Sequence, residues 1–342
     1  MSDNSELARR LKRRSFLGVA AGATAAAITG AAASPAVAGG HGHGHGSRRI
    51  VPRGKLGIQL YTVRDQIASV GFAKVFQELE RAGYDQIEYA GYTQGTGSIT
   101  LPQLRRLARD HDLFPIGSHV SHTGAYSFAE SLDQVLDDAE ALGMPYIGTW
   151  AGPNNRYGTT VDAVKRSCAE FNEYGAAAKA RGMKWYTHNH SEEFGFCSDN
   201  PKVRIYDLML AETDPDLVYL EMDIYWAYVG QYRFSKRPDG TPAPFKPLDY
   251  VLDDPRRYPL FHVKDGEHDE AQEHGYHMTD VGDGDIDYRR FIGTVTRRRG
   301  GDRYHNWLVE RDDAVDPATN PAGSFSTAKR SAAYLTGRRK NA

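Results

Sequence analysis

The feature that most constrains the fold of this chain is a unit that recurs eight times between residues 55 and 336. Each unit starts with a short apolar run, and most continue into a stretch in which apolar residues recur at helical spacing. This alternation is typical of parallel β/α architecture, in which helices connect the strands. The apolar runs lie at 56–61, 86–89, 114–119, 145–150, 183–188, 217–223, 259–264 and 307–310. The helical stretches lie at 66–82, 101–108, 128–142, 159–181, 203–211, 288–299 and 324–336.

Eight units in this length of chain fit a closed (β/α)8 barrel better than an open doubly wound sheet. No Gly-x-Gly-x-x-Gly follows the first apolar run, which counts against a dinucleotide-binding sheet. Gly83, Gly143 and Gly182 directly follow helical stretches, as C-terminal caps do. We therefore predict a single (β/α)8 TIM barrel over residues 55–342.

Residues 1–38 have the pattern of an export signal. Lys12, Arg13 and Arg14 precede an Ala- and Gly-rich apolar run, which ends in Ala-Val-Ala at 36–38. A basic start, an apolar middle and a small-residue cleavage site define a secretory signal, and the paired arginines before Ser-Phe-Leu resemble the twin-arginine type. The alternative is an uncleaved membrane anchor, but the Ala, Gly and Thr content makes insertion into lipid weak. We expect export, with no stable membrane insertion after cleavage.

A Gly/His-rich stretch, residues 39–54, links the signal to the barrel. Alternating Gly and His binds metal ions in solution, but a flexible linker is the simpler interpretation because the stretch has few side chains that can pack. Its histidines are therefore left out of the predicted site.

Charge and cysteine content exclude several classes of protein. The chain has 42 Lys and Arg against 44 Asp and Glu, and removal of residues 1–38 leaves 37 against 42. A mildly acidic protein is unsuited to polyanions, so no nucleic-acid partner is expected. Two cysteines in 342 residues exclude a disulfide scaffold and a thiolate-rich metal site.

Ionisable side chains collect where the predicted strands end, which is where (β/α)8 barrels carry their active sites. A lone histidine is as often structural as functional, but six strand ends here carry carboxylate or imidazole groups. Burying them together without a cation would cost on the order of several kcal/mol. Imidazole and carboxylate without thiolate suit Mn²⁺, Mg²⁺, Co²⁺ or Zn²⁺, so we predict one divalent metal ion. The strand-end residues include Glu88, His119, His188, His190, Glu193, Glu221, Asp223, His262, Lys264, Glu310 and Asp312.

Motifs in a fixed order carry a resemblance to a known superfamily. They are His188-Asn189-His190, Glu221-Met222-Asp223-Ile224-Tyr225-Trp226, Phe261-His262-Val263-Lys264-Asp265, Val281-Gly282-Asp283-Gly284 and Val309-Glu310. Their order resembles that of the sugar phosphate isomerase/epimerase superfamily, whose members share the xylose isomerase-like barrel. The segment 56–65 is also similar to that family's first strand. The resemblance covers roughly residues 55–336.

In that superfamily one metal is held by strands five to eight, usually through Glu, Asp, His and Glu. Strand five departs from the pattern, because His188 stands where many members have Glu. His188 takes the ligand role in our assignment, with His190 and Glu193 as alternatives. The ligands that the resemblance implies are His188, Asp223, His262 and Glu310.

The resemblance implies a sugar or sugar-like substrate that loses a proton next to its carbonyl carbon, through a metal-stabilised enediolate. For two of the residues named below a purely structural role is the alternative: Lys264 would only pair with Asp265 or Glu310, and Trp226 would only pack against its neighbours. The predicted catalytic residues are Glu310, Glu193 and His190. The predicted substrate-binding residues are Glu88, His119, Trp226 and Lys264.

A metal-dependent isomerase or epimerase is the leading hypothesis. A lyase or dehydratase acting on 3-keto-glycosides or cyclitols is close behind, because strand five lacks the second carboxylate of a two-base epimerase. A non-catalytic exported sugar-binding protein is the third possibility. Export favours free sugars or glycosides over sugar phosphates, which are cytosolic.

Residues 230–247 are an insertion that would serve as a lid or as a homo-oligomer contact, and residues 267–278 are expected to form a solvated loop.

Overall fold

The computed structural model describes residues 49–92, 99–298 and 300–338. The predicted signal peptide and residues 39–48 of the predicted linker lie outside the described residues. Among the residues described, no helix is both long enough and apolar enough to cross a membrane.

The compact unit begins at Arg49, ahead of the expected boundary at Lys55. Val51 is fully buried, and the backbone N–H groups of Ile50 and Val51 donate to the carbonyl oxygen of Leu335 at 2.9 and 3.2 Å. The chain is therefore fixed against the end of the last helix before the first strand begins.

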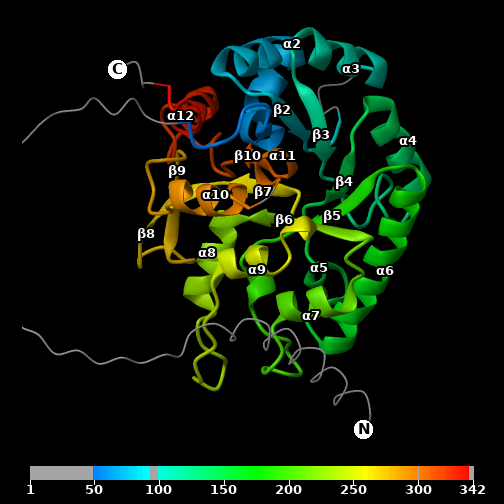
Figure 1. Ribbon diagram of the computed structural model, residues 1–342, viewed down its shortest axis with the longest axis vertical. Coiled ribbons are helices and arrows are strands. Elements are labelled where there is room, and N and C mark those ends of the chain that lie inside the picture. The colour runs from blue at the N-terminus through cyan, green and yellow to red at the C-terminus, as the bar shows by residue number, and fades with distance from the viewer. Residues whose placement is uncertain (1–48, 93–98, 299, 339–342) are drawn as a thin grey trace, which may run out of the picture. The chain divides into compact units, whose positions relative to one another are not determined.

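The predicted TIM barrel is confirmed: eight parallel strands form the centre of the unit and the helices lie outside them (Figure 1). Hydrogen-bonded neighbours follow the order β3-β2-β1-β10-β7-β6-β5-β4, and a single bridge between His119 and Gly148 joins β3 to β4. The strands are β1 (Leu56–Gln59), β2 (Gln86–Tyr89), β3 (Phe114–Ser118), β4 (Tyr146–Thr149), β5 (Lys184–His188), β6 (Val218–Asp223), β7 (Leu260–Val263) and β10 (Asn306–Val309).

The outer helices follow the predicted helical stretches closely. Gly83, which ends the first of them, has φ 93°, a left-handed conformation that favours glycine. The larger helices are α2 (Arg64–Ala82), α3 (Leu101–Asp110), α4 (Leu132–Leu142), α6 (Val161–Ala180), α7 (Ile205–Glu212), α8 (Ile224–Arg233), α10 (Tyr288–Thr296) and α12 (Ser324–Thr336). Short helical segments are η1 (Leu60–Val63), α5 (Asn154–Tyr157), η2 (Glu192–Phe194), α9 (Pro247–Asp253), η3 (Pro255–Arg257) and α11 (Gly301–Tyr304).

The barrel interior has an apolar layer below and an ionisable layer above. Because every second residue of a strand faces the same side, one strand supplies both layers in turn. His262 comes two positions after Leu260, and Glu310 comes two positions after Leu308. The apolar layer is the buried cluster of Ile116, Tyr146, Tyr186, Leu260 and Leu308.

Tyr186 crosses from the apolar layer to the ionisable one. Its ring passes so close to Gly148 that a Cβ atom at that position would lie 2.3 Å from the Tyr186 carbonyl oxygen and 2.6 Å from the ring. Only glycine fits there. The Tyr186 hydroxyl donates a hydrogen bond to Glu88, the first of the buried carboxylates.

Three segments differ from the sequence-based expectation. The helix expected from residue 128 begins at Leu132, because Ser127 and Ser131 hold the preceding residues in a turn through hydrogen bonds of 2.9 and 3.1 Å. The loop expected at 267–278 lies within an antiparallel hairpin of β8 (Asp265–His268) and β9 (Tyr276–Thr279). The insertion expected at 230–247 starts within α8 and ends at α9.

Candidate metal centre and active site

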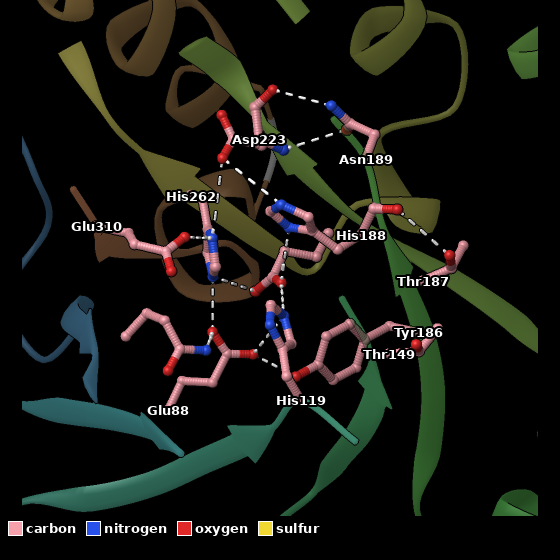
Figure 2. A network of polar contacts seen from close by, with 12 residues as sticks. Glu88, His119, Thr149, Tyr186, Thr187, His188, Asn189, Asp223, His262 and Glu310 are labelled. Atoms are coloured by element: carbon pink, nitrogen blue, oxygen red, sulfur yellow. Dashed lines mark hydrogen bonds and ion pairs between the residues drawn. The ribbon is translucent and has the colours of Figure 1, made fainter. Parts of the chain in front are cut away.

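Four neighbouring strands bring together one ligand-type atom each from His188, Asp223, His262 and Glu310, and these atoms all lie within 4.8 Å of one another (Figure 2). We call these four residues the outer set. Asp223 Oδ2 lies 3.6 Å from His188 Nε2 and 4.0 Å from His262 Nδ1, and His262 Nδ1 lies 2.6 Å from Glu310 Oε2. Ligands about 2.1 Å from a tetrahedral metal ion are about 3.4 Å apart, which is within this spread.

The two carboxylate oxygens of Asp223 make different contacts. Oδ1 accepts a hydrogen bond from the backbone N–H of Trp226 at 2.9 Å and so caps helix α8, whereas Oδ2 faces the outer set. Asn189 fixes the same strand end: its amide accepts from Asp223 N and donates to Asp223 O, both at 3.2 Å. The ends of β5 and β6 are thereby held in register.

A second group of buried side chains lies deeper in the barrel. Glu221 Oε2 pairs with His119 Nε2 at 2.7 Å and with His188 Nδ1 at 3.2 Å. Glu88 Oε2 lies 2.6 Å from His262 Nε2. Both imidazoles of the outer set therefore have their second ring nitrogen against a carboxylate. This arrangement orients a metal-binding histidine and fixes which nitrogen carries its hydrogen.

His119, His188, Glu221 and His262 also have four ligand-type atoms within 4.8 Å. In this inner set Glu221 Oε2 is already shared between two imidazoles. In the outer set neither Asp223 Oδ2 nor His262 Nδ1 has the geometry of a hydrogen bond within the described part of the chain, although Lys264 Nζ lies 2.9 Å from the former and Glu310 Oε2 lies 2.6 Å from the latter. In the inner set one ligand-type oxygen, Glu221 Oε1, is in the same position. Buried polar atoms without such partners mark the place where an ion fits. The outer set is therefore the better candidate for the metal.

The balance of charge also favours a bound cation. Four buried carboxylates, those of Glu88, Glu221, Asp223 and Glu310, face a single buried ammonium group, that of Lys264. Three negative charges then remain. Where no cation binds, His262 helps to balance them: burial acts to lower its pKa, but Glu221, Glu310 and Glu88 raise that pKa well above its ordinary value. The residues present fit a divalent ion both in donor chemistry and in charge.

The carboxyl groups of Glu88 and Glu221 have different pKa values. Burial and the nearby Glu221 charge raise the pKa of Glu88. Burial also acts to raise the pKa of Glu221, but His262 and His119 hold that pKa well below its ordinary value. Glu221 is thus the ionised member of the pair, and Glu88 is the one that takes up a proton.

The outer set opens into a cavity of about 580 Å³ at the carboxyl ends of the strands. This is the end of the barrel where active sites of this architecture lie. The cavity is lined by Tyr61, Ala90, Gly91, His119, Val120, Ser121, Tyr126, Trp150, His188, His190, Lys264, Glu310 and Asp312.

Of the residues that the sequence singles out, Lys264 and His190 line the cavity together with His119, His188 and Glu310. Lys264 Nζ lies 2.9 Å from Asp223, 2.8 Å from Glu310 and 2.8 Å from Asp312. Of its two predicted partners Glu310 is therefore the one it contacts. Burial lowers the pKa of His190 to about 4, so this imidazole is neutral near pH 7.

Five other predicted residues are absent from the described cavity lining: Asp223 and His262 of the outer set, and Glu88, Glu193 and Trp226. Glu88 lies below the outer set. Glu193 is turned into its own loop, where Oε2 accepts from the backbone N–H of His190 at 2.8 Å, and burial raises its pKa to about 7. Trp226 is half-buried and donates from Nε1 to Asp312 at 3.2 Å.

Five residues of the site received no role from the sequence, although Glu221 and Asp312 were counted among its strand-end groups. A role for Glu221 was predictable, because it lies two residues before Asp223 on the same strand and therefore faces the same side of the sheet, one layer deeper. Asp312 follows Glu310 by the same spacing. The exposed rings carry no periodic signal, since they lie on loops and at a strand end. They are Tyr61, Tyr126 and Trp150.

Comparison with solved structures gives the same architecture. A sugar phosphate isomerase/epimerase from Parabacteroides distasonis is 26% identical, with a TM-score of 0.63 over 82% of this chain and 97% of the other. A second structure described in the same words and from the same organism is 24% identical, with a TM-score of 0.64 over 83% and 94%. The IolI protein with a bound zinc atom is 15% identical, with a TM-score of 0.55 over 84% and 100%, a likeness of fold alone.

Among curated proteins none matches this chain. The family model of the xylose isomerase-like TIM barrel matches residues 76–320, well over half of the sequence. This chain belongs to the xylose isomerase-like TIM barrel family.

Proposed function

We propose that this protein is a divalent-metal-dependent isomerase or epimerase of a sugar or sugar-like substrate. The observation that carries the proposal is the outer set, which places His188, Asp223, His262 and Glu310 around one point at the wall of the cavity. The family match and the Parabacteroides likeness agree with it.

The reaction requires that a proton leave the carbon next to a carbonyl group. A divalent ion held by the outer set would supply Lewis-acid stabilisation of the resulting enediolate. We assign Glu310 as a ligand that also serves as the base. Burial works against its charge, but Lys264 and His262 hold the pKa of Glu310 well below its ordinary value, so it stays ionised and able to accept a proton.

We assign His190 as the second proton-transfer group. It lines the same cavity as Glu310, and its neutral imidazole accepts a proton at one substrate atom and returns it at another. Glu193, the alternative, holds the loop on which His190 stands. We assign Lys264 to the substrate oxygens as a fixed positive charge, since its neighbours Asp223, Asp312 and Glu310 raise its pKa well above the ordinary value despite burial.

A lyase or dehydratase acting on a 3-keto-glycoside or a cyclitol is the second candidate. The observation that favours it is the unlike pair of groups at the cavity: one carboxylate, Glu310, and one neutral imidazole, His190. Elimination needs a base at one carbon and a proton donor at the leaving group on the next. A two-base epimerase uses two equivalent groups on opposite faces of the sugar.

Elemental analysis of the purified protein tests the metal proposal first. We expect about one equivalent of Mn, Co, Zn or Mg, and its loss in the Asp223→Ala, His262→Ala double variant. Metal is added back before any negative result is accepted, because weakly held Mg²⁺ washes out. Protein that binds no metal under either condition would refute this proposal.

Turnover of free sugars and keto-sugars in D₂O then separates the candidates. An isomerase or epimerase returns an isomer that carries deuterium, and a lyase returns an unsaturated product and a released group. Glu310→Gln should lower turnover by about 10³-fold or more, whereas Glu192→Gln, on the same side of the barrel but paired with Arg233, should not. A sugar-binding protein without activity would bind sugar and never turn it over.

We also propose that the protein is exported through a twin-arginine-type signal. The support is the sequence of residues 1–38 alone. Replacing Arg13 and Arg14 by lysine should leave the folded protein inside the cell. Unchanged export of that variant would argue against the assignment.

A further inference from the structure

Three aromatic side chains stand exposed around the mouth of the cavity. Tyr61, Tyr126 and Trp150 have exposed fractions of 42%, 38% and 42%, and all three line the cavity. We call them the aromatic rim. Single exposed rings are ordinary on a protein surface, but three gathered at one opening mark a binding surface.

The aromatic rim and the outer set come from different strands of the barrel. Tyr61 lies in η1 directly after β1, Tyr126 lies in the loop after β3, and Trp150 directly follows β4. The outer set comes from β5, β6, β7 and β10, which are consecutive neighbours in the barrel. Because β4 is the neighbour of β5, the Trp150 ring centroid lies 6.3 Å from that of His190, so a ligand that extends from the outer set reaches an exposed ring face directly beside the charged groups.

Contacts with neighbours hold the rings in place. The Arg64 guanidinium carbon lies 3.7 Å from the centroid of the Tyr61 ring, and Arg64 also donates to the carbonyl oxygens of Tyr61 at 2.7 Å and Asp312 at 3.0 Å. The Tyr126 hydroxyl donates to Asp138 at 3.0 Å. A ligand that stacks on such rings loses less free energy to ordering them.

The cavity has no cation to spare for a phosphate group. Its described lining contains no arginine, and its one lysine, Lys264, is matched by the carboxylates of Asp223, Glu310 and Asp312. A sugar phosphate at the outer set would add negative charge beside Glu310 and Asp312, and the guanidinium of Arg64, which is not part of this lining, lies over Tyr61 and donates to two backbone carbonyl oxygens. Uncharged rings, in contrast, gain from stacking on tyrosine and tryptophan.

We propose that the aromatic rim is a stacking subsite for the second ring of a glycoside. The uncharged sugar that reacts lies at the outer set, and the ring joined to it, another sugar or a phenyl group, lies on Tyr61, Tyr126 and Trp150. The inference rests on the proposed function and names its substrate class. A cavity of about 580 Å³ is in the range, about 300–1,000 Å³, of pockets that hold ligands larger than one sugar ring.

Calorimetric titration of the metal-loaded full chain with four probes tests the subsite. The probes are methyl β-glucoside, phenyl β-glucoside, cellobiose and glucose 6-phosphate. We expect phenyl β-glucoside, cellobiose or both to bind about tenfold more tightly than methyl β-glucoside. Which of the two gains affinity distinguishes a phenyl group from a sugar as the second ring. The phosphate of glucose 6-phosphate should give no gain in affinity.

Substitutions locate the second ring. Trp150→Ala and Tyr126→Ala should each reduce the tenfold advantage to about threefold or less, while the affinity for methyl β-glucoside stays within about twofold. The matched control is Phe114→Ala, because Phe114 is 47% exposed at the start of β3, outside this cavity. Saturation-transfer NMR should show contact between the second ring and the protein. This contact should be lost in Trp150→Ala and kept in Phe114→Ala.

Three results would overturn the subsite: equal affinity for one-ring and two-ring probes, tighter binding of glucose 6-phosphate, or an advantage that survives both rim substitutions. Any of them, with turnover intact, leaves the proposed reaction standing. Conversely, a metal-loaded protein that binds two-ring probes through the rim but turns over no sugar refutes the reaction and keeps the subsite. A protein that binds none of the four probes refutes both.

Discussion

At the scale of single residues, the site depends on carboxylates that would not touch the metal. His188 and His262 each present one ring nitrogen to the outer set and the other to a buried carboxylate, Glu221 or Glu88. Glu221 is the ionised member of that pair, held so by His262 and His119. The orientation of both imidazoles therefore depends more on Glu221 than on Glu88.

We predict that Glu221→Gln lowers metal affinity about 10- to 100-fold without removing a ligand of the outer set. Glu88→Gln should have a smaller effect, because the pKa of Glu88 is already raised toward the neutral form that glutamine imitates. Competition with a chelator measures both, and Glu170→Gln, a carboxylate paired with Arg156 away from the site, is the control. Equal losses in the two variants would contradict this division of charge.

At the scale of elements, the loop after β5 carries its own buried acid. Glu193 is 3% exposed, and burial raises its pKa to about 7 from an ordinary value of 4.5. Below pH 4.5 the carboxyl group is protonated whether the chain is folded or unfolded. As the pH rises through 7 the folded state must ionise a buried group, so stability is lost.

We predict that Glu193→Gln, which does not titrate, becomes more stable relative to the native protein as pH rises from 4.5 to above 7, by at most about 3 kcal/mol. Urea unfolding of metal-free protein at pH 5 and pH 8 measures the difference. Glu192 is a neighbouring control with the opposite sign: burial acts to raise its pKa, but a hydrogen bond from Arg233 lowers it. A constant difference for Glu193→Gln across this range would show that its carboxylate is not strained by burial.

The same scale shows what the sequence could predict. The strands of the barrel fall within the predicted apolar runs or start one residue before them, because a parallel strand buried on both faces is apolar over most of its length. The start of α4 was not predictable from periodicity, since Ser127 and Ser131 replace helical bonds by local ones. The β8–β9 hairpin is polar, so it carries no apolar run to detect.

At the scale of the whole molecule, the site joins parts of the chain that are far apart in sequence. His188 and Glu310 belong to β5 and β10, with β6 and β7 between them in the barrel. The family resemblance pointed to four strand-end residues, and the structure brings one ligand-type atom of each together, because parallel strands end at the same side of the barrel. The exposed rings were beyond that reasoning, because loop conformation decides where Tyr126 points.

We predict that metal binding stabilises the whole barrel against heat. A ligand present at 100 times its dissociation constant adds about 2.7 kcal/mol, and here it would tie four neighbouring strands together. Chelation should lower the unfolding temperature measured by calorimetry, and the Asp223→Ala, His262→Ala double variant should show no metal-dependent shift. A variant that responds to metal as the native protein does would place the ion elsewhere.

The β3–β4 junction has the least backbone pairing of the barrel: within the described residues one bridge, His119 to Gly148, joins the two strands, whereas every other junction has at least three paired residues. Each backbone hydrogen bond contributes about 1 kcal/mol. Tyr126 follows β3 and Trp150 follows β4, so the two rings stand on opposite sides of this junction. Separation of β3 from β4 would therefore break fewer backbone hydrogen bonds than separation of any other neighbouring pair, and it would move these two rings apart.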